Sequence, residues 1–144
     1  MLEDVLIRDW MTSDVISVTA ETPIAHAHQI MKKNKIRRLV VTDNNNKPVG
    51  IVTIGDVREA SPSDATSLSI WELNYLWAQL KVEEVMSKQV LTATPGDPVI
   101  NAARIMLESK VSGVPVVDET GQTVGIITES DVFRMLVRSA EERA

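Results

Sequence analysis

The chain of 144 residues repeats its own pattern at a spacing of 75 positions, and this repeat limits the folds open to it. The stretch GIVTIGDV begins at Gly50, and the stretch GIITESDV begins at Gly125. Residues 5–58 align without a gap with residues 80–133, and 16 of the 54 aligned pairs are identical. The sequence therefore predicts two copies of one structural unit.

Each copy predicts the element order strand, helix, strand, strand, helix. The short first strand is expected at residues 15–18 and again at residues 90–93. Thr22 and Asp97 are each followed by proline, which predicts a helix N-cap with proline at the first helical position. Apolar residues then recur at intervals of three and four, as in an amphipathic helix: Ile24, Ala27, Ile30 and Met31, then Val99, Ala102, Ile105 and Met106.

A hairpin and a second helix complete each copy. Two aliphatic runs in each copy are separated by turn-forming residues, which predicts a pair of antiparallel strands. The strands are expected at residues 38–42 and 49–54, and again at residues 114–117 and 124–128. The second helices are expected to open at Asp56 and Asp131.

Domain limits follow from the copies and from the segment between them. We predict a first domain at residues 1–60, a linker at 61–81 and a second domain at 82–140. The linker is expected to start as a loop over residues 60–67 and to continue as a helix capped by Ser69. One face of this helix is apolar, and we expect it to pack back on the body through Ile70, Leu73, Trp77 and Leu80.

Composition excludes several classes of function. With 20 acidic and 15 basic residues the net charge is -5, which disfavours a broad contact with nucleic acid or an anionic membrane. No cysteine is present, so disulfides and thiolate chemistry are absent. No apolar run approaches the length of a membrane span, and a cytoplasmic location is the default expectation. Few residues are aromatic, so the core is expected to be aliphatic.

The repeated GxxTxxD motif and the run KVSGVPVVD, which begins at Lys110, resemble a tandem pair of CBS (cystathionine beta-synthase) domains, the Bateman module. The resemblance covers nearly the whole chain. It implies an α/β (α+β) fold with two tandem β-α-β-β-α units packed about a pseudo-twofold axis. It also implies a stand-alone regulatory module that binds an adenine nucleotide in the cleft between the repeats and senses energy state or a metabolite.

The motif has a physical logic of its own. Glycine in a strand lets another group approach the backbone closely. Threonine at the strand end can cap the following helix or offer its hydroxyl to a ligand. Asp56 and Asp131 are expected in the first helical turn, where the helix dipole favours negative charge and a carboxylate can accept two hydrogen bonds from a ribose diol. Threonine and aspartate at a helix start also form a stabilising cap without any ligand.

Resemblance to the family implies roles for particular residues. The aspartates hold the ribose hydroxyls, the threonines lie near the ribose or phosphate, and the strand before each hairpin turn supplies backbone groups and walls for the adenine. The residues concerned are Ile36, Arg37, Arg38, Thr53 and Asp56 in the first copy, and Val111, Ser112, Gly113, Val114, Pro115, Thr128 and Asp131 in the second. AMP, ADP or ATP is the expected ligand, with S-adenosylmethionine as a substitute.

The copies differ where the ligand is expected. Arg38 stands where the second copy has Gly113, so base binding is expected at the second copy, with phosphates reaching Arg37 or Arg38. Both arginines belong to a basic cluster that is also consistent with a solvated helix end. The cluster consists of Lys32, Lys33, Lys35, Arg37 and Arg38.

Two other functions remain open. The chain is either a sensor, a protein-interaction module with vestigial ligand sites, or a nucleic-acid-associated regulator that uses the basic cluster. No nucleophile and base stand in a recognisable arrangement, so an enzyme is not expected. His26 and His28 point to different faces of a predicted helix, so a metal site is not expected.

The last helix predicts assembly. Apolar residues cover more than one of its faces: Val132, Phe133, Met135, Leu136 and Val137. This excess, together with the resemblance, leads us to expect a homodimer. A regulated partner protein is also expected, although the sequence does not identify it.

Overall fold

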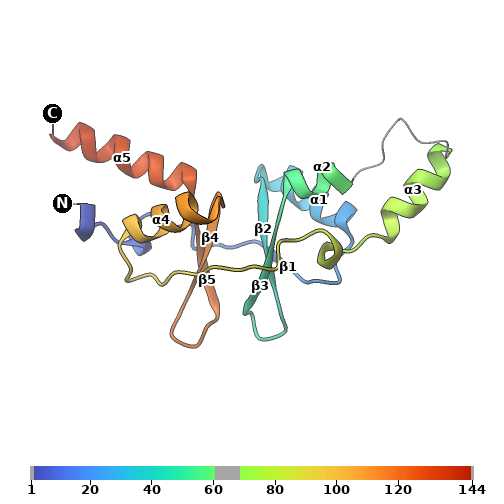
Figure 1. Cartoon of the computed structure of the whole chain (residues 1–144), viewed down its shortest axis with the longest axis horizontal. Helices are drawn as coiled ribbons and strands as arrows, with labels where there is room; N and C mark the ends of the chain where they lie inside the picture. Colours follow the sequence, from blue (N-terminus) through green and yellow to red (C-terminus); the bar gives the residue numbers. More distant parts are fainter. Residues whose placement is uncertain (1, 61–68, 144) are drawn as a thin grey trace. The chain divides into compact units, whose positions relative to one another are not determined.

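The computed structural model describes residues 2–60 and 69–143, which form a mixed helix and strand structure with one sheet in each copy (Figure 1). The first copy contains β1 (Ser17–Val18), α1 (Ile24–Asn34), β2 (Arg38–Thr42), β3 (Pro48–Thr53) and α2 (Ile54–Ala60). The linker contains α3 (Ile70–Gln79), and the second copy contains α4 (Val99–Ser109), β4 (Gly113–Val117), β5 (Thr123–Thr128) and α5 (Glu129–Arg143). Short 3-10 helices lie at Leu2–Asp4, Ile7–Asp9 and Val82–Glu84.

The sheets have the predicted hairpins. In the first copy β1 pairs in parallel with β2, and β2 pairs antiparallel with β3. In the second copy β4 and β5 form an antiparallel pair, and the expected first strand at 90–93 is reduced to one parallel bridge between Ala93 and Val116. The hairpins predicted from the repeat are therefore confirmed, as is the mixed helix and strand fold that the resemblance implied.

The structure forms two compact units, and each unit contains a short segment from the other sequence copy. We call these the exchanged segments: residues 2–15 in the unit of the second copy and residues 80–89 in the unit of the first. One unit contains the described residues of Met1–Val15, Asn45–Lys47 and Val90–Ala144, and the other contains those of Ile16–Asn44 and Pro48–Gln89. The start of the first sequence copy, residues 5–15, thus belongs with the rest of the second copy, and the start of the second copy, residues 80–89, belongs with the rest of the first. The limits 1–60, 61–81 and 82–140 remain a prediction about where the sequence copies begin and end.

Backbone hydrogen bonds hold these exchanged segments in place. The amide of Val99, at the start of α4, donates to the carbonyl oxygen of Val5 at 2.8 Å. The amide of Ile24, at the start of α1, donates to the carbonyl oxygen of Leu80 at 3.0 Å. Each bond satisfies an amide that the helix itself leaves without a partner.

These bonds explain why the predicted helix caps were wrong by one residue. Pro23 and Pro98 are the N-caps, because both are extended, with ψ of 140° and 144°, and neither helix has a side-chain cap. Thr22 instead accepts a hydrogen bond from the amide of Thr19, and Asp97 accepts one from the amide of Thr94. Both side chains close the turn before the helix, since a distant carbonyl already takes the first helical amide.

The second helix of each copy begins earlier than expected, whereas α1, the first helix of the first copy, ends within the basic cluster. Helix α2 begins at Ile54 and α5 at Glu129, two residues before each motif aspartate, which still lies in the first turn. Lys32 and Lys33 occupy the last turn of α1 and are exposed. This is the position in which cations complement the helix dipole.

Each unit has its own aliphatic core, as the composition predicted. One core contains Ile7, Ala93, Val99, Ala102, Met106, Val114, Val116, Ile127, Val132 and Met135. The other contains Val18, Ile24, Ala27, Met31, Leu39, Val41, Val52, Val57 and Val82. Because Ile7 and Val82 are fully buried, the exchanged segments are structural parts of the units that receive them.

Helix α3 packs on the first copy through one side. The Ser69 hydroxyl oxygen accepts a hydrogen bond from the amide of Glu72, as predicted. Trp77 and Leu80 pack against the core of that unit, and the Trp77 ring meets His28 edge-on. The loop predicted at residues 61–67 and the side chains of Ile70 and Leu73 lie outside the described residues, whereas Ala60 is the last residue of α2.

The hairpin turn of the second copy is closed by Asp118. Its carboxylate accepts hydrogen bonds from the hydroxyl and amide of Thr120 and from the amide of Gln122. The hydroxyl of Thr120 in particular lowers the pKa of Asp118 below its ordinary value. The turn residues that separate the predicted strands therefore have a defined structural role.

The motif glycines are required by close packing. A Cβ at Gly50 would lie 2.9 Å from the carbonyl oxygen of Ser87 and against the sulfur of Met86. A Cβ at Gly125 would lie 3.0 Å from the carbonyl oxygen of Thr12 and against the sulfur of Met11. The group that approaches each glycine is thus the exchanged segment, and its methionine is identical in the two copies.

We expect Gly50→Ala to destabilise the chain by about 1 to 3 kcal/mol, because the new methyl group meets a backbone carbonyl that cannot yield cheaply. Thermal unfolding monitored by circular dichroism measures this change. Gly55→Ala is the matched control, since the nearest heavy atom to its Cβ is 3.5 Å away and the residue is helical. The control should be neutral or stabilising. Equal losses from the two substitutions would contradict this explanation.

Candidate functional site

In the first copy, Thr53 and Asp56 join the end of β3 to the start of α2. The amide of Thr53 donates to Oδ2 of Asp56 at 2.8 Å, and the amide of Asp56 donates to Oγ1 of Thr53 at 3.1 Å. These reciprocal bonds form a capping box. Among the described residues, all bonds to the Asp56 carboxylate are made to Oδ2, which leaves Oδ1 as an acceptor.

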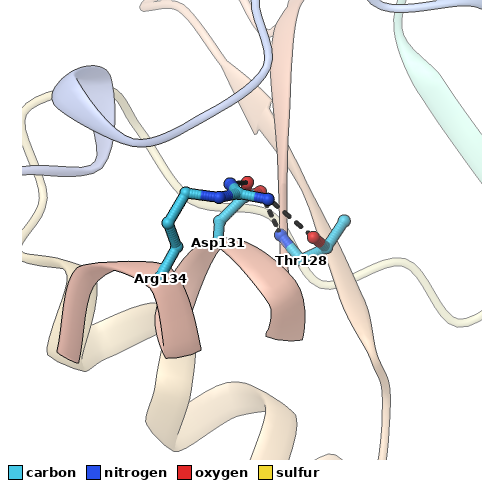
Figure 2. A network of polar contacts seen from close by, with 3 residues as sticks. All are labelled: Thr128, Asp131 and Arg134. Atoms are coloured by element: carbon cyan, nitrogen blue, oxygen red, sulfur yellow. Dashed lines mark hydrogen bonds and ion pairs between the residues drawn. The ribbon is translucent and has the colours of Figure 1, made fainter. Parts of the chain in front are cut away.

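In the second copy, the corresponding carboxylate is more fully engaged (Figure 2). Oδ2 of Asp131 accepts hydrogen bonds from the amide of Thr128 at 2.9 Å and from its hydroxyl at 3.1 Å. Oδ1 accepts an ion-pair hydrogen bond from the guanidinium of Arg134 at 2.9 Å. Asp131 is 5% exposed, so its charge is held by these three bonds rather than by water.

The strands that precede the hairpin turns bring other predicted residues to these junctions. Arg38 lies opposite Thr53 in the β2–β3 pair, and Gly113 lies opposite Thr128 in the β4–β5 pair. The residues before Arg38 and Gly113 are joined to the second helices. The amide of Ile54, the first residue of α2, donates to the carbonyl oxygen of Arg37, and the amide of Glu129, the first residue of α5, donates to the carbonyl oxygen of Ser112. The strand and motif residues of each copy therefore meet at one point.

Some predicted residues face the interior instead. Val114 is fully buried in the core of its unit, and Pro115 is buried beside it. Ile36, Val111 and Ser112 are partly buried, and Arg37 is exposed. Side-chain contacts with a ligand are thus available to Arg37 and to the partly buried residues, whereas Val114 stabilises the strand that carries them.

Arg134 is a residue of this site that was not predicted from the sequence. A signal for it is present, because an arginine three residues after an aspartate in a helix lies on the same face and can pair with it. The aligned residue of the first copy is Glu59, so the repeat gave no reason to look at this position.

The arrangement has the chemistry of a hydroxyl-binding site. A carboxylate at a helix start accepts strong hydrogen bonds, and a vicinal diol can offer two of them. Within the part of the chain that the structure describes, no three His, Asp or Glu side chains gather as a metal site. In the same residues, no helix is both long enough and apolar enough to cross a membrane.

The chain belongs to the CBS domain family. The family model matches twice, at residues 7–63 and 82–138, and each match contains one complete GxxTxxD motif. The protein is therefore a tandem pair of CBS domains, as the resemblance of its motifs implied.

Relatives include proteins of the same size and much larger ones. A CBS domain-containing protein of Dictyostelium discoideum is 29% identical over 95% of this chain and 94% of its own length. An L-aspartate semialdehyde sulfurtransferase of Methanocaldococcus jannaschii is 31% identical over 90% of this chain, but the match covers only 23% of the enzyme. The enzyme name thus describes a protein of which this region is a small part.

Solved CBS pairs have the same fold. The CBS domain pair of protein MJ0100, in complex with 5'-methylthioadenosine and S-adenosyl-L-methionine, has a TM-score of 0.78 and 30% identity, and the match covers 94% of this chain and 98% of that one. CBSX2 in complex with AMP has a TM-score of 0.76 and 26% identity, with 94% of this chain and 98% of that chain covered. CBSX2 is a CBS-pair protein of Arabidopsis thaliana.

We expect Asp131→Ala to reduce the free energy of unfolding by about 2 to 3 kcal/mol, because a buried charge-assisted network is lost. Asp56→Ala should cost about 1 kcal/mol, since its half-exposed carboxylate accepts one bond from Thr53. Urea unfolding measures both values. The exposed Asp14→Ala serves as a control and should have little effect. A larger loss for Asp56→Ala than for Asp131→Ala would contradict the assignment of bonds.

Proposed function

We propose that this CBS pair is a regulatory module that binds an adenosine nucleotide at its Thr–Asp junctions. The observation that carries the proposal is the repeated junction itself, which holds a carboxylate at a helix start beside the end of a strand in both copies. Similar CBS pairs with adenosine ligands, namely 5'-methylthioadenosine, S-adenosyl-L-methionine and AMP, support it.

In this proposal the aspartates accept the ribose hydroxyls. Asp56 serves the first copy and Asp131 the second, with Thr53 and Thr128 beside them. The adjoining strand segments, residues 36–38 and 111–115, offer backbone groups and apolar contacts to the adenine ring. The preferred ligand is AMP, ADP or ATP, and S-adenosylmethionine is the substitute. The module performs no catalysis of its own, and it acts on a regulated partner because the ligand favours one conformation of the pair over another.

Ligand-induced thermal stabilisation tests this function. At a concentration of one hundred times its dissociation constant, a ligand adds about 2.7 kcal/mol and raises the melting temperature by several degrees. We expect AMP, ADP or ATP to do so and GTP to have less effect. Asp56→Ala and Asp131→Ala, each compared with its own ligand-free melting curve, should reduce the shift. If none of the ligands raised the melting temperature at millimolar concentration, the Thr–Asp junctions would be helix caps only and the chain a protein-interaction module.

We also propose that the chain forms a homodimer through the outer face of the second copy. A groove of about 430 Å³ lies between α4 and α5, and Met106, Leu107, Val132 and Phe133 are among its lining residues. Leu107 is 81% exposed and Phe133 is 60% exposed. The first copy has Lys32 and Arg58 at the aligned positions, so this apolar face is particular to the second copy. Another molecule of the same chain would cover an apolar surface of this kind in a homodimer.

The double substitution Leu107→Lys and Phe133→Arg, which introduces the residues of the first copy, should convert the dimer to a monomer, because charges would be buried at the contact. Light scattering after size-exclusion chromatography measures the mass. Trp71→Lys is the control, since Trp71 is as exposed as Leu107 but lies on α3. The control should remain dimeric. A monomeric wild-type chain at micromolar concentration would refute the proposed dimer.

A further inference from the structure

The acceptor sites of Asp131 are nearly all used within the protein. A carboxylate offers about four lone-pair positions. Thr128 takes two of them on Oδ2, and Arg134 takes one on Oδ1. A vicinal diol requires two acceptors, so a ribose can bind this carboxylate fully only when the guanidinium leaves Oδ1. Arg134 thus competes directly with the hydroxyls of a ligand.

The guanidinium is able to leave. Its side chain is 61% exposed, whereas the side chain of Asp131 is 7% exposed. An exposed arginine turns between rotamers at little cost beyond the loss of its ion pair. Its bond to Asp131 uses NH1, and the other N–H donors of the guanidinium can bind another anion in the same region. Figure 2 shows the side chain extending along α5 towards the carboxylate.

The junction does not need Arg134 in order to form. In the first copy, Thr53 and Asp56 build a complete capping box, although the residue aligned with Arg134 is the acidic Glu59. The ion pair of the second copy is therefore an addition to the cap and not a condition for it. At this position the second copy has the positive Arg134 and the first copy the negative Glu59. This difference of two charge units changes the local potential without changing the cap.

We propose that Arg134 is the residue that selects anionic ligands at the second copy. A ligand with a phosphate group offers the guanidinium a bidentate partner when the ribose takes its place on Asp131. Neutral adenosine displaces Arg134 without this compensation, and the sulfonium of S-adenosylmethionine meets a like charge. The second copy thereby favours phosphorylated adenosine. This inference rests on the proposed function, because it assumes that Asp131 binds a ribose.

Isothermal titration calorimetry tests the selection in a chain that carries Asp56→Ala, so that the measured site is the second copy. The ligands are AMP, adenosine and S-adenosylmethionine. We expect Arg134→Gln to weaken AMP binding about tenfold or more, as loss of a charge-assisted contact does, while adenosine binding is unchanged or tightened. The AMP affinity of Arg134→Lys should lie between those of the parent chain and of Arg134→Gln, because lysine keeps the charge but lacks the planar guanidinium.

Arg138→Gln is the matched control. Arg138 lies one turn further along α5, is exposed, and makes no bond to Asp131 in the structure, so the variant removes the same charge without the contact. It should leave the ratio of AMP to adenosine affinity unchanged. The preference of the parent chain for AMP over adenosine should also fall as potassium chloride is raised.

The outcomes separate the two proposals. Equal changes in AMP and adenosine affinity on Arg134→Gln, or no change in either, would overturn the role of Arg134, whereas the proposed function would stand if binding still depended on Asp131. In that case the ion pair is a helix-stabilising contact alone. If the Asp56→Ala chain bound none of the three ligands at millimolar concentration, the role of Arg134 would fail, and if the wild-type chain bound none of them either, the proposed function would fail as well.

Discussion

The hydrogen bond from a strand-ending threonine amide to an aspartate three residues later joins sheet to helix in both copies. In the first copy this bond is 2.8 Å long, and in the second it is 2.9 Å. It fixes where β3 and β5 end and where α2 and α5 begin. Because the adjoining strand lies opposite the same threonine, the bond also sets the place of Arg38 and Gly113 relative to the carboxylate. The candidate site depends on this one contact.

Most of the fold could be predicted because it is written in local pattern and in repetition. Alternating aliphatic runs with turn residues gave the hairpins, and the aspartates proved to lie in first helical turns. The N-caps predicted at Thr22 and Asp97 were wrong, because the first amides of α1 and α4 bond to the carbonyl oxygens of Leu80 and Val5. Partners so distant in sequence leave no local signal. The ion pair of Arg134 was not predicted for a different reason. The aligned residue of the first copy, Glu59, is acidic and cannot pair with an aspartate, so the repeat does not indicate this contact.

The two copies divide their positions between framework and divergence. Positions that are identical in both, such as the motif glycines and the methionines packed on them, are fixed by contacts too close for a larger or differently shaped group. Several buried positions differ only by one aliphatic residue for another, as at Leu39 and Val114, so each core stays apolar. Exposed positions differ more widely, as at Lys32 and Leu107, because a change of charge or size there leaves the core intact. One scaffold can therefore present two different surfaces.

The exchange of segments has a consequence for how the chain is made. Synthesis proceeds from the N-terminus, and the unit built from residues 16–44 and 48–89 has all its parts once residue 89 has emerged. Residues 2–15 must wait, because Ile7 and Met11 find their partners around Asp97 and Gly125. The apolar residues of this N-terminal segment thus stay without their core while residues 16–89 are synthesised. The unit that receives the segment is completed after the other, so its folding joins a part of the chain that is made early to a part that is made late.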